Sequence, residues 1–537
     1  MKVNEVDVAL QKMSLDEKVG QLLMIGFPQS RLDIRLQKHI QKIHASAFIL
    51  FKRNIESLSQ VSDLNSRLRK FTRHISPEAP LIAIDQEGGA VARIATVPSA
   101  PTAFSVGLTK NPALAYELGA EMGKILKTYG FNMNLAPVLD LTDLKRANFI
   151  GLRSFSSEAE TAAMMSTQYS RGLIESGVLP TAKHFPGMTS ISQDPHLELI
   201  ASPRSADELR KEDLIPYLKY FELGPLTAIM MSHLIYPALD STKTPAIYSR
   251  KISRDLLRTE LGYSGLVITD DIQMRTPDSS TKTWTNAIDS LKAGADILIL
   301  SWSFRDQEKT FFEIKRSVEL GILPIQELDE KVRRILVVKR GFSKSEPQPI
   351  NGKVTVHYSK KLEEVTNKIL STNIQAIIPE LKNLRLNSGV CVYSTSSHFS
   401  NSFGFEKKLS AKTYQLKPET KPSSLALHMK KNRCNLNLIP IYGRLSSRLL
   451  SEIKDASLTQ KTFVINFSHP MILSGVWPDK QTIQVGHAYS NSGLALARAL
   501  VKLGEQQQIA RGEGQLSPDR IPAGQTSSAS PPRAQSP

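Results

Sequence analysis

The sequence predicts an α/β protein with an N-terminal (β/α)8 TIM-type barrel and a smaller, sandwich-like C-terminal α/β domain. Three observations support this prediction. Short, almost wholly apolar runs recur eight times within residues 1–343, segments with helical spacing separate them, and most runs end in a polar residue. Uniformly apolar strands are typical of parallel sheets that are covered on both faces.

The eight apolar runs are the expected barrel strands. They occupy residues 21–27, 45–51, 80–86, 131–137, 178–185, 225–233, 265–271 and 295–301. Eight β/α units in roughly 340 residues match a somewhat enlarged (β/α)8 barrel. An open doubly wound sheet is the alternative, but it would want a glycine-rich first turn, which the sequence lacks.

The segments between the runs carry the spacing of amphipathic helices. In residues 58–68, an apolar stripe is formed by Leu58, Val61, Leu64 and Leu68. Residues 111–128 and 157–175 show the same spacing, and the second of these helices is expected to open with a capping region, Ser156-Ser157-Glu158-Ala159-Glu160. Residues 331–342 predict a basic helix that closes the barrel domain.

A second set of elements follows a proline-containing linker. A helix is expected at 358–378, strands at 389–394, 436–442, 462–467 and 482–485, and helices at 446–456 and 491–503. The predicted boundaries are 1–343 for the barrel, 344–379 for the linker and connecting helix, 380–504 for the C-terminal domain and 505–537 for a tail. The tail is rich in Gln, Ser, Pro and Gly, which predicts disorder.

The bulk composition is that of a soluble globular protein, with 41% hydrophobic and 22% charged residues. No apolar run is long enough for a membrane span, and the first residues lack the pattern of a secretory signal. Two cysteines suit a reducing compartment, so we expect a cytoplasmic protein. The net charge of +17 comes without a nucleic-acid motif, a metal-ligand spacing or a phosphate loop, so we expect no nucleic-acid partner, metal or cofactor.

The ends of the strands carry most of the candidate chemistry. Six of the eight runs finish at or just before polar or ionisable residues: Asp85, Asp140, Lys183–His184, Ser232–His233, Asp270–Asp271 and Ser301. In a barrel the carboxyl ends of the strands meet at one rim, where active sites lie. The sequence therefore predicts a polar pocket at that rim.

Three stretches on that rim, 85–93, 183–196 and 267–274, resemble glycoside hydrolase family 3. The most specific is Lys-His-Phe-Pro-Gly from Lys183, followed at the family's distance by Asp194 and His196. The Asp-x-His spacing is typical of the β-N-acetylglucosaminidase branch, and the resemblance runs from about residue 15 to 342. It implies an exo-acting, retaining β-N-acetylglucosaminidase whose partner is a carbohydrate, from peptidoglycan recycling or from chitin.

The resemblance also implies roles for individual residues. Asp270 matches the nucleophile that forms a glycosyl-enzyme intermediate, and His196 matches the acid/base. Asp194 is expected to accept the other ring N–H of His196. Asp271 is expected to be structural, pairing with an arginine or a lysine.

Substrate binding is expected from five side chains, and His233 is expected to play a secondary role. Hydrogen bonds to sugar hydroxyls are expected from Asp85, Lys183 and His184. Two arginines match family positions that either touch the sugar or form salt bridges: Arg93 and Arg153.

The sequence departs from the family at two places. Met188-Thr189 stands where His-Gly is usual, and Ala90 stands where Arg is common. Three alternatives therefore accompany the main hypothesis: a non-catalytic sugar-binding protein, a β-N-acetylglucosaminide phosphorylase and a β-glucosidase of the same family.

Overall fold

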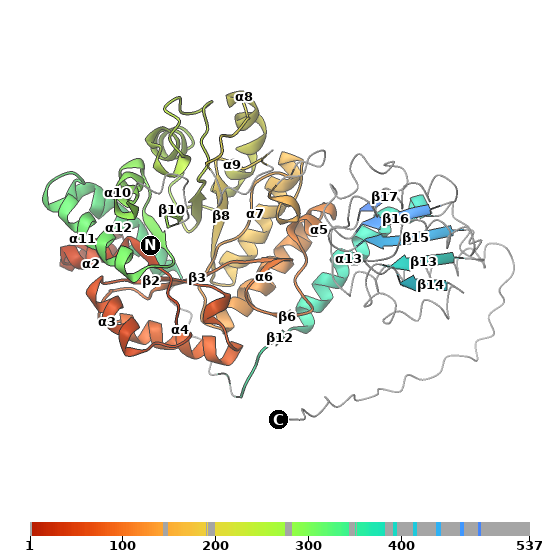
Figure 1. The fold of residues 1–537 in the computed structure, drawn as a ribbon, viewed down its shortest axis with the longest axis horizontal. Coiled ribbons are helices and arrows are strands. Elements are labelled where there is room, and N and C mark those ends of the chain that lie inside the picture. Colours follow the sequence, from red (N-terminus) through yellow and green to blue (C-terminus); the bar gives the residue numbers. More distant parts are fainter. Residues whose placement is uncertain are drawn as a thin grey trace.

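Eight parallel strands close into a barrel in the computed structural model, which describes residues 3–142, 149–189, 191, 199–273, 282–342, 350 and 352–381 and five strands further along the chain. The barrel order is β1-β11-β10-β9-β8-β7-β3-β2, and Figure 1 shows helices surrounding the strands. Its strands are β1 Leu23–Ile25, β2 Ala47–Leu50, β3 Leu81–Ile84, β7 Met133–Asn134, β8 Leu179–Phe185, β9 Ala228–Met231, β10 Leu266–Asp271 and β11 Ile297–Leu300. Each lies inside one of the eight apolar runs, so the predicted (β/α)8 barrel is confirmed.

The barrel closes because the first and last strands pair with each other. Leu23 of β1 is in register with Leu298 of β11, and Met24 of β1 is in register with Ala47 of β2. A closed sheet has no exposed edge, and its apolar strands are covered by helices outside and by side chains inside. This explains why the strand sequences show no polar–apolar alternation.

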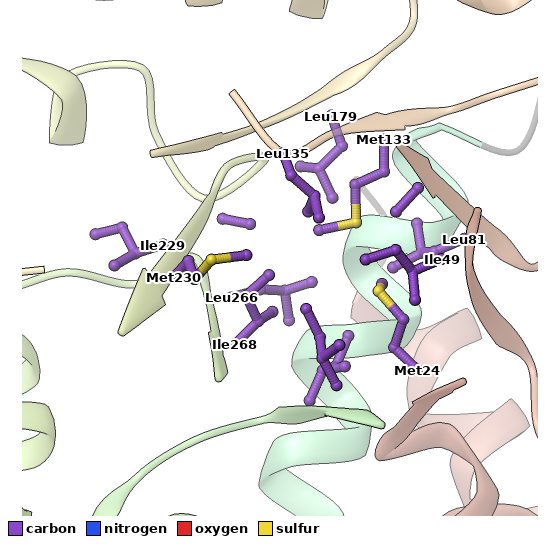
Figure 2. Close-up of a cluster of buried hydrophobic side chains, with 14 of the residues drawn as sticks. Met24, Ile49, Leu81, Met133, Leu135, Leu179, Ile229, Met230, Leu266 and Ile268 are labelled. Carbon is purple, nitrogen blue, oxygen red and sulfur yellow. The ribbon is translucent and has the colours of Figure 1, made fainter. Parts of the chain in front are cut away.

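The interior of the barrel is filled by aliphatic and methionine side chains (Figure 2). The residues labelled in the figure are Met24, Ile49, Leu81, Met133, Leu135, Leu179, Ile229, Met230, Leu266 and Ile268. Each fully buried side chain of this size stabilises the fold by roughly 1.5–3 kcal/mol. Three of them, Ile49, Leu135 and Met230, also form the floor of a cavity at the carboxyl ends of the strands.

Helices surround the barrel. They are α1 Val3–Lys12, α2 Leu15–Gln21, α3 Ile34–Lys42, α4 Leu58–Thr72, α5 Ala103–Leu108, α6 Pro112–Thr128, α7 Ala159–Glu175, α8 Ala206–Glu208, α9 Ile215–Phe221, α10 Thr283–Ala293, α11 Phe304–Glu319 and α12 Ile325–Gly341. Shorter or wider helical turns are η1 Lys52–Asn54, η2 Gly151–Arg153, η3 Leu209–Asp213, η4 Ala246–Tyr248 and η5 Lys251–Glu260.

Local sequence explains where several of these helices begin. Ser57 caps α4 by accepting a hydrogen bond from the N–H of Gln60, and the predicted stripe on this helix is buried. Helix α7 has its N-cap, Glu158, inside the predicted capping region, although no side chain caps the helix there. The hydroxyl of Ser156 accepts the N–H of Glu158, two residues further along. Helix α12 begins at Ile325, before the predicted position.

A hairpin directly after β3 was not predicted. Strand β4 (Gln86–Gly88) pairs antiparallel with β5 (Val91–Ala92). Its turn contains Gly88 and Gly89, which both have positive φ angles that favour glycine. Strand β6 (Thr96–Val97) follows and pairs with β12 (His357–Tyr358). The hairpin extends the carboxyl end of β3 over the rim of the barrel.

Beyond the barrel, helix α13 (Lys360–Leu381) packs on α6 and α5 and extends toward a second sheet (Figure 1). An ion pair joins Lys368 to Glu117 at 3.0 Å, and the amide of Asn373 donates to the carbonyl of Ser105 at 2.8 Å. These contacts explain why the predicted connecting helix follows the barrel surface.

The second sheet has five parallel strands in the order β14-β13-β15-β16-β17. They are β13 Val390–Ser394, β14 Lys412–Gln415, β15 Leu436–Ile441, β16 Thr462–Asn466 and β17 Thr482–Gln484. Four of these strands were predicted, and β14 was missed because its sequence, KTYQ, contains no apolar run. The helices predicted at 446–456 and 491–503 and the tail predicted at 505–537 lie outside the described residues. None of the described helices combines the length and the apolar character needed to cross a membrane.

Candidate active site

A cavity of about 330 Å³ opens at the carboxyl ends of the barrel strands. Six of the predicted site residues line it: Asp85, Arg93, Arg153, Lys183, His184 and Asp270. They come from positions between 85 and 270, and the closure of the barrel brings them to one rim. Asp194 and His196 lie outside the described residues.

The ionisable residues of this cavity are all on one side of it. Among the described residues, they lie at or after the carboxyl ends of five strands that are neighbours in the barrel, β3, β7, β8, β9 and β10. They are Asp85, Glu87, Arg93, Arg153, Lys183, His184, His233, Asp270 and Asp271. We call this set the charged side of the cavity.

Asp270 lies near the end of β10 and is held in its ionised form. One of its carboxylate oxygens accepts the backbone N–H of Asp271 at 2.8 Å. Burial by itself raises the pKa of Asp270, but His233, His184, the backbone N–H of Asp271 and Lys183 together outweigh it and hold that pKa below its usual value. The carboxylate therefore has the charge state that a nucleophile needs at neutral pH.

A buried ion network forms the part of the charged side around Glu87. The ammonium of Lys183 lies 2.9 Å from Asp85 Oδ1 and 2.7 Å from Glu87 Oε1. Arg153 donates two hydrogen bonds of 2.8 Å to the two oxygens of Glu87. Although burial opposes ionisation, Arg153 and Lys183 hold the pKa of Glu87 well below its usual range. Burial also opposes the charged form of Lys183, but Asp85 and Glu87 raise its pKa.

The two predicted arginines differ in how they are held. Arg153 is fixed by the bidentate ion pair with Glu87. A salt bridge was one of the two roles expected for this arginine, the other being direct contact with the sugar. Arg93 Nη2 lies 3.7 Å from Asp85 Oδ2, and its buried Nε has no hydrogen-bond partner among the described residues. Arg93 lines the cavity and is held less closely by its carboxylate partner than Arg153 is.

Asp140 positions His184 and the start of the following loop. Its carboxylate lies 2.7 Å from Nδ1 of His184 and also accepts the backbone N–H groups of His184 and Met188. Because a carboxylate only accepts, Nδ1 of His184 carries a proton in this contact. The ring is therefore held with its other nitrogen available to the cavity side.

The two residues that depart from the family pattern, Met188 and Thr189, are buried at the start of the loop. Met188 lines the cavity, and Tyr236 donates a hydrogen bond of 2.7 Å to the carbonyl of Gly187 just before it. A side chain at Gly187 would come within 2.8 Å of Asp213, and its φ of 124° favours glycine. The beginning of this loop is therefore closely packed.

Asp271, the neighbour of Asp270, makes structural contacts of its own. Its carboxylate accepts the N–H of Gln273 at 3.0 Å, and burial raises its pKa to about 6. Its carbonyl oxygen lies 3.2 Å from Nε2 of His233. Arg53 interacts electrostatically with Asp271. An arginine was one of the two expected partners of Asp271, although the two side chains do not form a close ion pair.

Three residues important to this geometry have no such role in the sequence-based predictions: Glu87, Asp140 and Tyr236. Glu87 lies two residues after Asp85, and this short spacing of two acids was the available signal. Asp140 was noted as a strand-end residue, but its contact with His184 spans 44 residues. No group of His, Cys, Asp and Glu within the described part of the chain is arranged to hold a metal ion.

Comparison with known proteins agrees with this geometry. The family model described as "Glycosyl hydrolase family 3 N terminal domain" matches residues 14–338. A beta-hexosaminidase of Stenotrophomonas maltophilia (strain K279a) is 34% identical over 286 residues, which cover 52% of this chain and 83% of the relative.

Two solved structures share the fold. A glycoside hydrolase family 3 beta-N-acetylglucosaminidase from Paenibacillus sp. str. FPU-7 has a TM-score of 0.77 at 24% identity, covering 91% of this chain and 97% of that one. Beta-glucoside phosphorylase BglX bound to 2FGlc has a TM-score of 0.74 at 21% identity, covering 94% of each chain. At these identities the likeness concerns the fold.

Proposed function

Since the chain belongs to glycoside hydrolase family 3 and is a glycosidase acting on O-glycosyl compounds, we propose that it is an exo-acting, retaining β-N-acetylglucosaminidase. The observation that carries the proposal is the partly buried, ionised Asp270 in a cavity whose charged side presents hydrogen-bonding groups. The beta-hexosaminidase names of the relatives support the sugar specificity.

In the proposed mechanism, Asp270 attacks the anomeric carbon as the bond from that carbon to the leaving oxygen breaks. This step gives a glycosyl-enzyme ester with inverted configuration. Water then displaces the carboxylate, and the second inversion restores the β configuration. The lowered pKa of Asp270 supports its role as the attacking group, because a protonated carboxyl is a poor nucleophile.

We propose His196 as the acid/base and Asp194 as its partner. His196 would donate a proton to the leaving oxygen in the first step and take one from water in the second. The spacing from Lys183 to Asp194 and His196 supports this assignment. The packing of Gly187 and Met188 against Tyr236 and Asp140 supports it further, because it holds the beginning of the loop that carries both residues.

Substrate binding is proposed for Asp85, Arg93, Lys183 and His184. Asp85 and Lys183 hydrogen-bond to each other, and a sugar hydroxyl can bridge such a pair because it both donates and accepts. Arg93 is proposed to contact the sugar or its acetamide directly, since it lines the cavity and its Nη2 lies 3.7 Å from its nearest carboxylate oxygen, on Asp85. Arg153 is proposed to act through Glu87, which it holds in place.

The size of the cavity supports cleavage at a chain end. A volume of about 330 Å³ is at the lower end of the range for small-molecule pockets and suits one terminal sugar. Cell-wall fragments of peptidoglycan recycling, or chitin fragments, are the proposed natural substrates. The cysteine-poor composition suits the proposed cytoplasmic setting.

Purified protein and an aryl β-N-acetylglucosaminide test the proposal. We expect release of N-acetylglucosamine, and we expect Asp270→Ala to lose nearly all turnover. The matched control is Asp255→Ala, because Asp255 is an exposed carboxylate on η5 outside the cavity. Wild-type turnover in Asp270→Ala would contradict the nucleophile assignment.

A β-N-acetylglucosaminide phosphorylase is the second candidate, favoured by the histidine at the acid/base position. A neutral imidazole repels an incoming phosphate less than a carboxylate does. Product analysis with and without phosphate separates the two activities, because only phosphorolysis yields the sugar 1-phosphate.

A further inference from the structure

A second cavity, of about 180 Å³, lies at the amino ends of β10 and β11, the opposite end of the barrel from the candidate active site. It is formed by η5, the end of α10, the turn before β11 and the first half of α12. Gly294 lines it just before β11, and Arg258 lines it while donating to the carbonyls of Tyr263 and Gly265, just before β10. No described residue lines both cavities. We call this second cavity the basic pocket.

The basic pocket carries more cations than its carboxylates balance. Its ionisable lining residues are five cations and two carboxylates: Arg254, Arg258, Lys292, Lys331, Arg334, Glu327 and Glu330. A third carboxylate, on the fully buried Asp296, lies 2.6 Å from Nη2 of Arg258 and 2.9 Å from Nη2 of Arg334. Five cations and three carboxylates leave a formal excess of two positive charges.

Lys331 is the buried cation of this pocket. The residue is only 4% exposed, and its ammonium donates a hydrogen bond of 2.8 Å to the carbonyl of Ala295. An ammonium has three N–H donors, and within the described part of the chain the other two have no partner. Burial lowers the pKa of Lys331 to about 8; Arg334 and Arg258 add to this effect, and Asp296 and Glu327 oppose it.

The carboxylates around the pocket do not pair with this buried ammonium. Glu327 forms its ion pair with Arg254, at 3.2 Å. Glu330 is exposed, so solvent and salt screen its charge. Both oxygens of Asp296 accept hydrogen bonds from arginines. Among the described residues, Lys331 therefore has no carboxylate partner of its own.

The size and the donors of the pocket suit a small anion with several oxygens. Its volume lies below the range of about 300–1,000 Å³ that is typical of pockets for drug-sized ligands. Guanidinium groups bind phosphate oxygens through paired N–H donors, and ammonium groups bind them as point charges. Both kinds of cation line the pocket. Two of its arginines lie on η5, which has the wide winding of a π-helix, a form that often occurs at functional sites.

We propose that the basic pocket binds a dianionic phosphate group, as free phosphate or as the head of a small phosphate monoester. The two charges of the ligand match the excess of two cations, and Lys331 supplies the buried ammonium that pairs with it. The inference is independent of the proposed function, because the basic pocket and the catalytic cavity share no lining residue. A ligand held by η5, α10 and α12 together binds only the folded chain and therefore stabilises it.

Calorimetric titration of the purified protein with inorganic phosphate, against chloride at the same ionic strength, tests the proposal. We expect saturable binding and a Tm that rises with phosphate concentration. Lys331→Met should weaken the affinity about tenfold, because it removes a buried, charged hydrogen-bond donor. Lys292→Met removes an exposed cation and should weaken the affinity about threefold.

Exposed positions keep the test independent of folding. Glu330→Gln removes a negative charge from the lining and should strengthen phosphate binding about twofold. The matched controls are Lys124→Met on α6 and Glu160→Gln on α7, because both residues are exposed and line neither cavity. Both controls should bind phosphate with wild-type affinity.

Proton uptake shows whether the anion binds beside Lys331. At pH 8 about half of the Lys331 side chains are charged, and a bound dianion raises their pKa, so the complex takes up protons from the buffer. Methyl phosphate suits this measurement, since the second pKa of a phosphate monoester is about 6 and the ligand is already dianionic. Binding enthalpies in two buffers of different ionisation enthalpy measure the uptake, which Lys331→Met should abolish.

The two sources of the phosphate group differ in affinity. Tighter binding of methyl phosphate than of inorganic phosphate assigns the pocket to a monoester, and the reverse order assigns it to the free ion. Failure of both ligands to bind overturns the proposal. So does binding that Lys331→Met and Lys292→Met leave unchanged, or binding that is lost in Lys183→Met instead, because Lys183 lines the catalytic cavity.

Discussion

Replacing Glu87 with glutamine removes one charge from the buried ion network and nearly preserves the shape of the side chain. Glu87 and Lys183 have side chains only 4% exposed, and Arg153 donates two hydrogen bonds to Glu87. Removing one partner of a buried ion pair costs about 3–5 kcal/mol. Because the glutamine oxygen still accepts one hydrogen bond, we expect about 3 kcal/mol of destabilisation.

The expected change in melting temperature follows from the size of the barrel. An unfolding entropy of about 2.1 cal/mol/K per residue, over roughly 330 residues, gives about 0.7 kcal/mol/K. A loss of about 3 kcal/mol should then lower Tm by about 4 °C. Scanning calorimetry or circular dichroism measures this shift. The control is Glu222→Gln, whose exposed ion pair with Lys219 should contribute less than about 1 kcal/mol.

A double variant tests whether the charges act together. Glu87→Gln combined with Arg153→Met removes both members of the bidentate pair and leaves the pair of Lys183 with Asp85. The double variant should therefore be less destabilised than the sum of the two single variants. Strict additivity, or a Glu87→Gln variant as stable as wild type, would refute the reasoning.

Two further predictions concern aspartates at the rim. Asp140→Asn should lower kcat/KM about 10–100-fold, because the ring of His184 loses its orientation and one lost hydrogen bond to a charged group is worth about 1.5–3 kcal/mol. Kinetics on an aryl glycoside measure this change. A variant with wild-type kcat/KM would contradict the prediction. Asp271 has a pKa raised to about 6 by burial, so the folded state binds more protons than the unfolded state between about pH 4 and pH 6. Stability contributed at this position therefore falls as pH rises through that window. In Asp271→Asn the side-chain oxygen can still accept from Gln273, but it does not titrate. The unfolding free energy of this variant minus that of wild type should therefore rise by on the order of 2 kcal/mol from pH 4 to pH 7. A difference that stays constant over this range would exclude the effect.

Much of the barrel could be predicted from the sequence because its signals are local. Each strand is a short apolar run, and helical stripes such as that of Leu58, Val61, Leu64 and Leu68 repeat within one segment. The polar strand ends were equally visible, and barrel geometry requires that they meet. Strand β14 was missed, because its sequence has no distinctive local pattern.

The partners of the site residues were decided by the tertiary structure. Glu87 meets Arg153 and Lys183, which are 66 and 96 positions further along the chain, only because the β4–β5 hairpin lies over the same rim. Asp140 reaches His184 because β7 and β8 are neighbours. Side-chain pairing of this kind depends on strand order and on the direction of each side chain.

The sequence by itself determined the eight strands, the carboxylate at position 270 and the family-like loop from Lys183. Only the closed barrel decided that the cavity has two chemically different sides. Phe51 and Trp302, which are distant in sequence, line the same part of the cavity because β11 and β2 both flank β1. The physical reason is that local patterns encode burial and hydrogen bonding within a segment, whereas the composition of a cavity depends on which segments become neighbours.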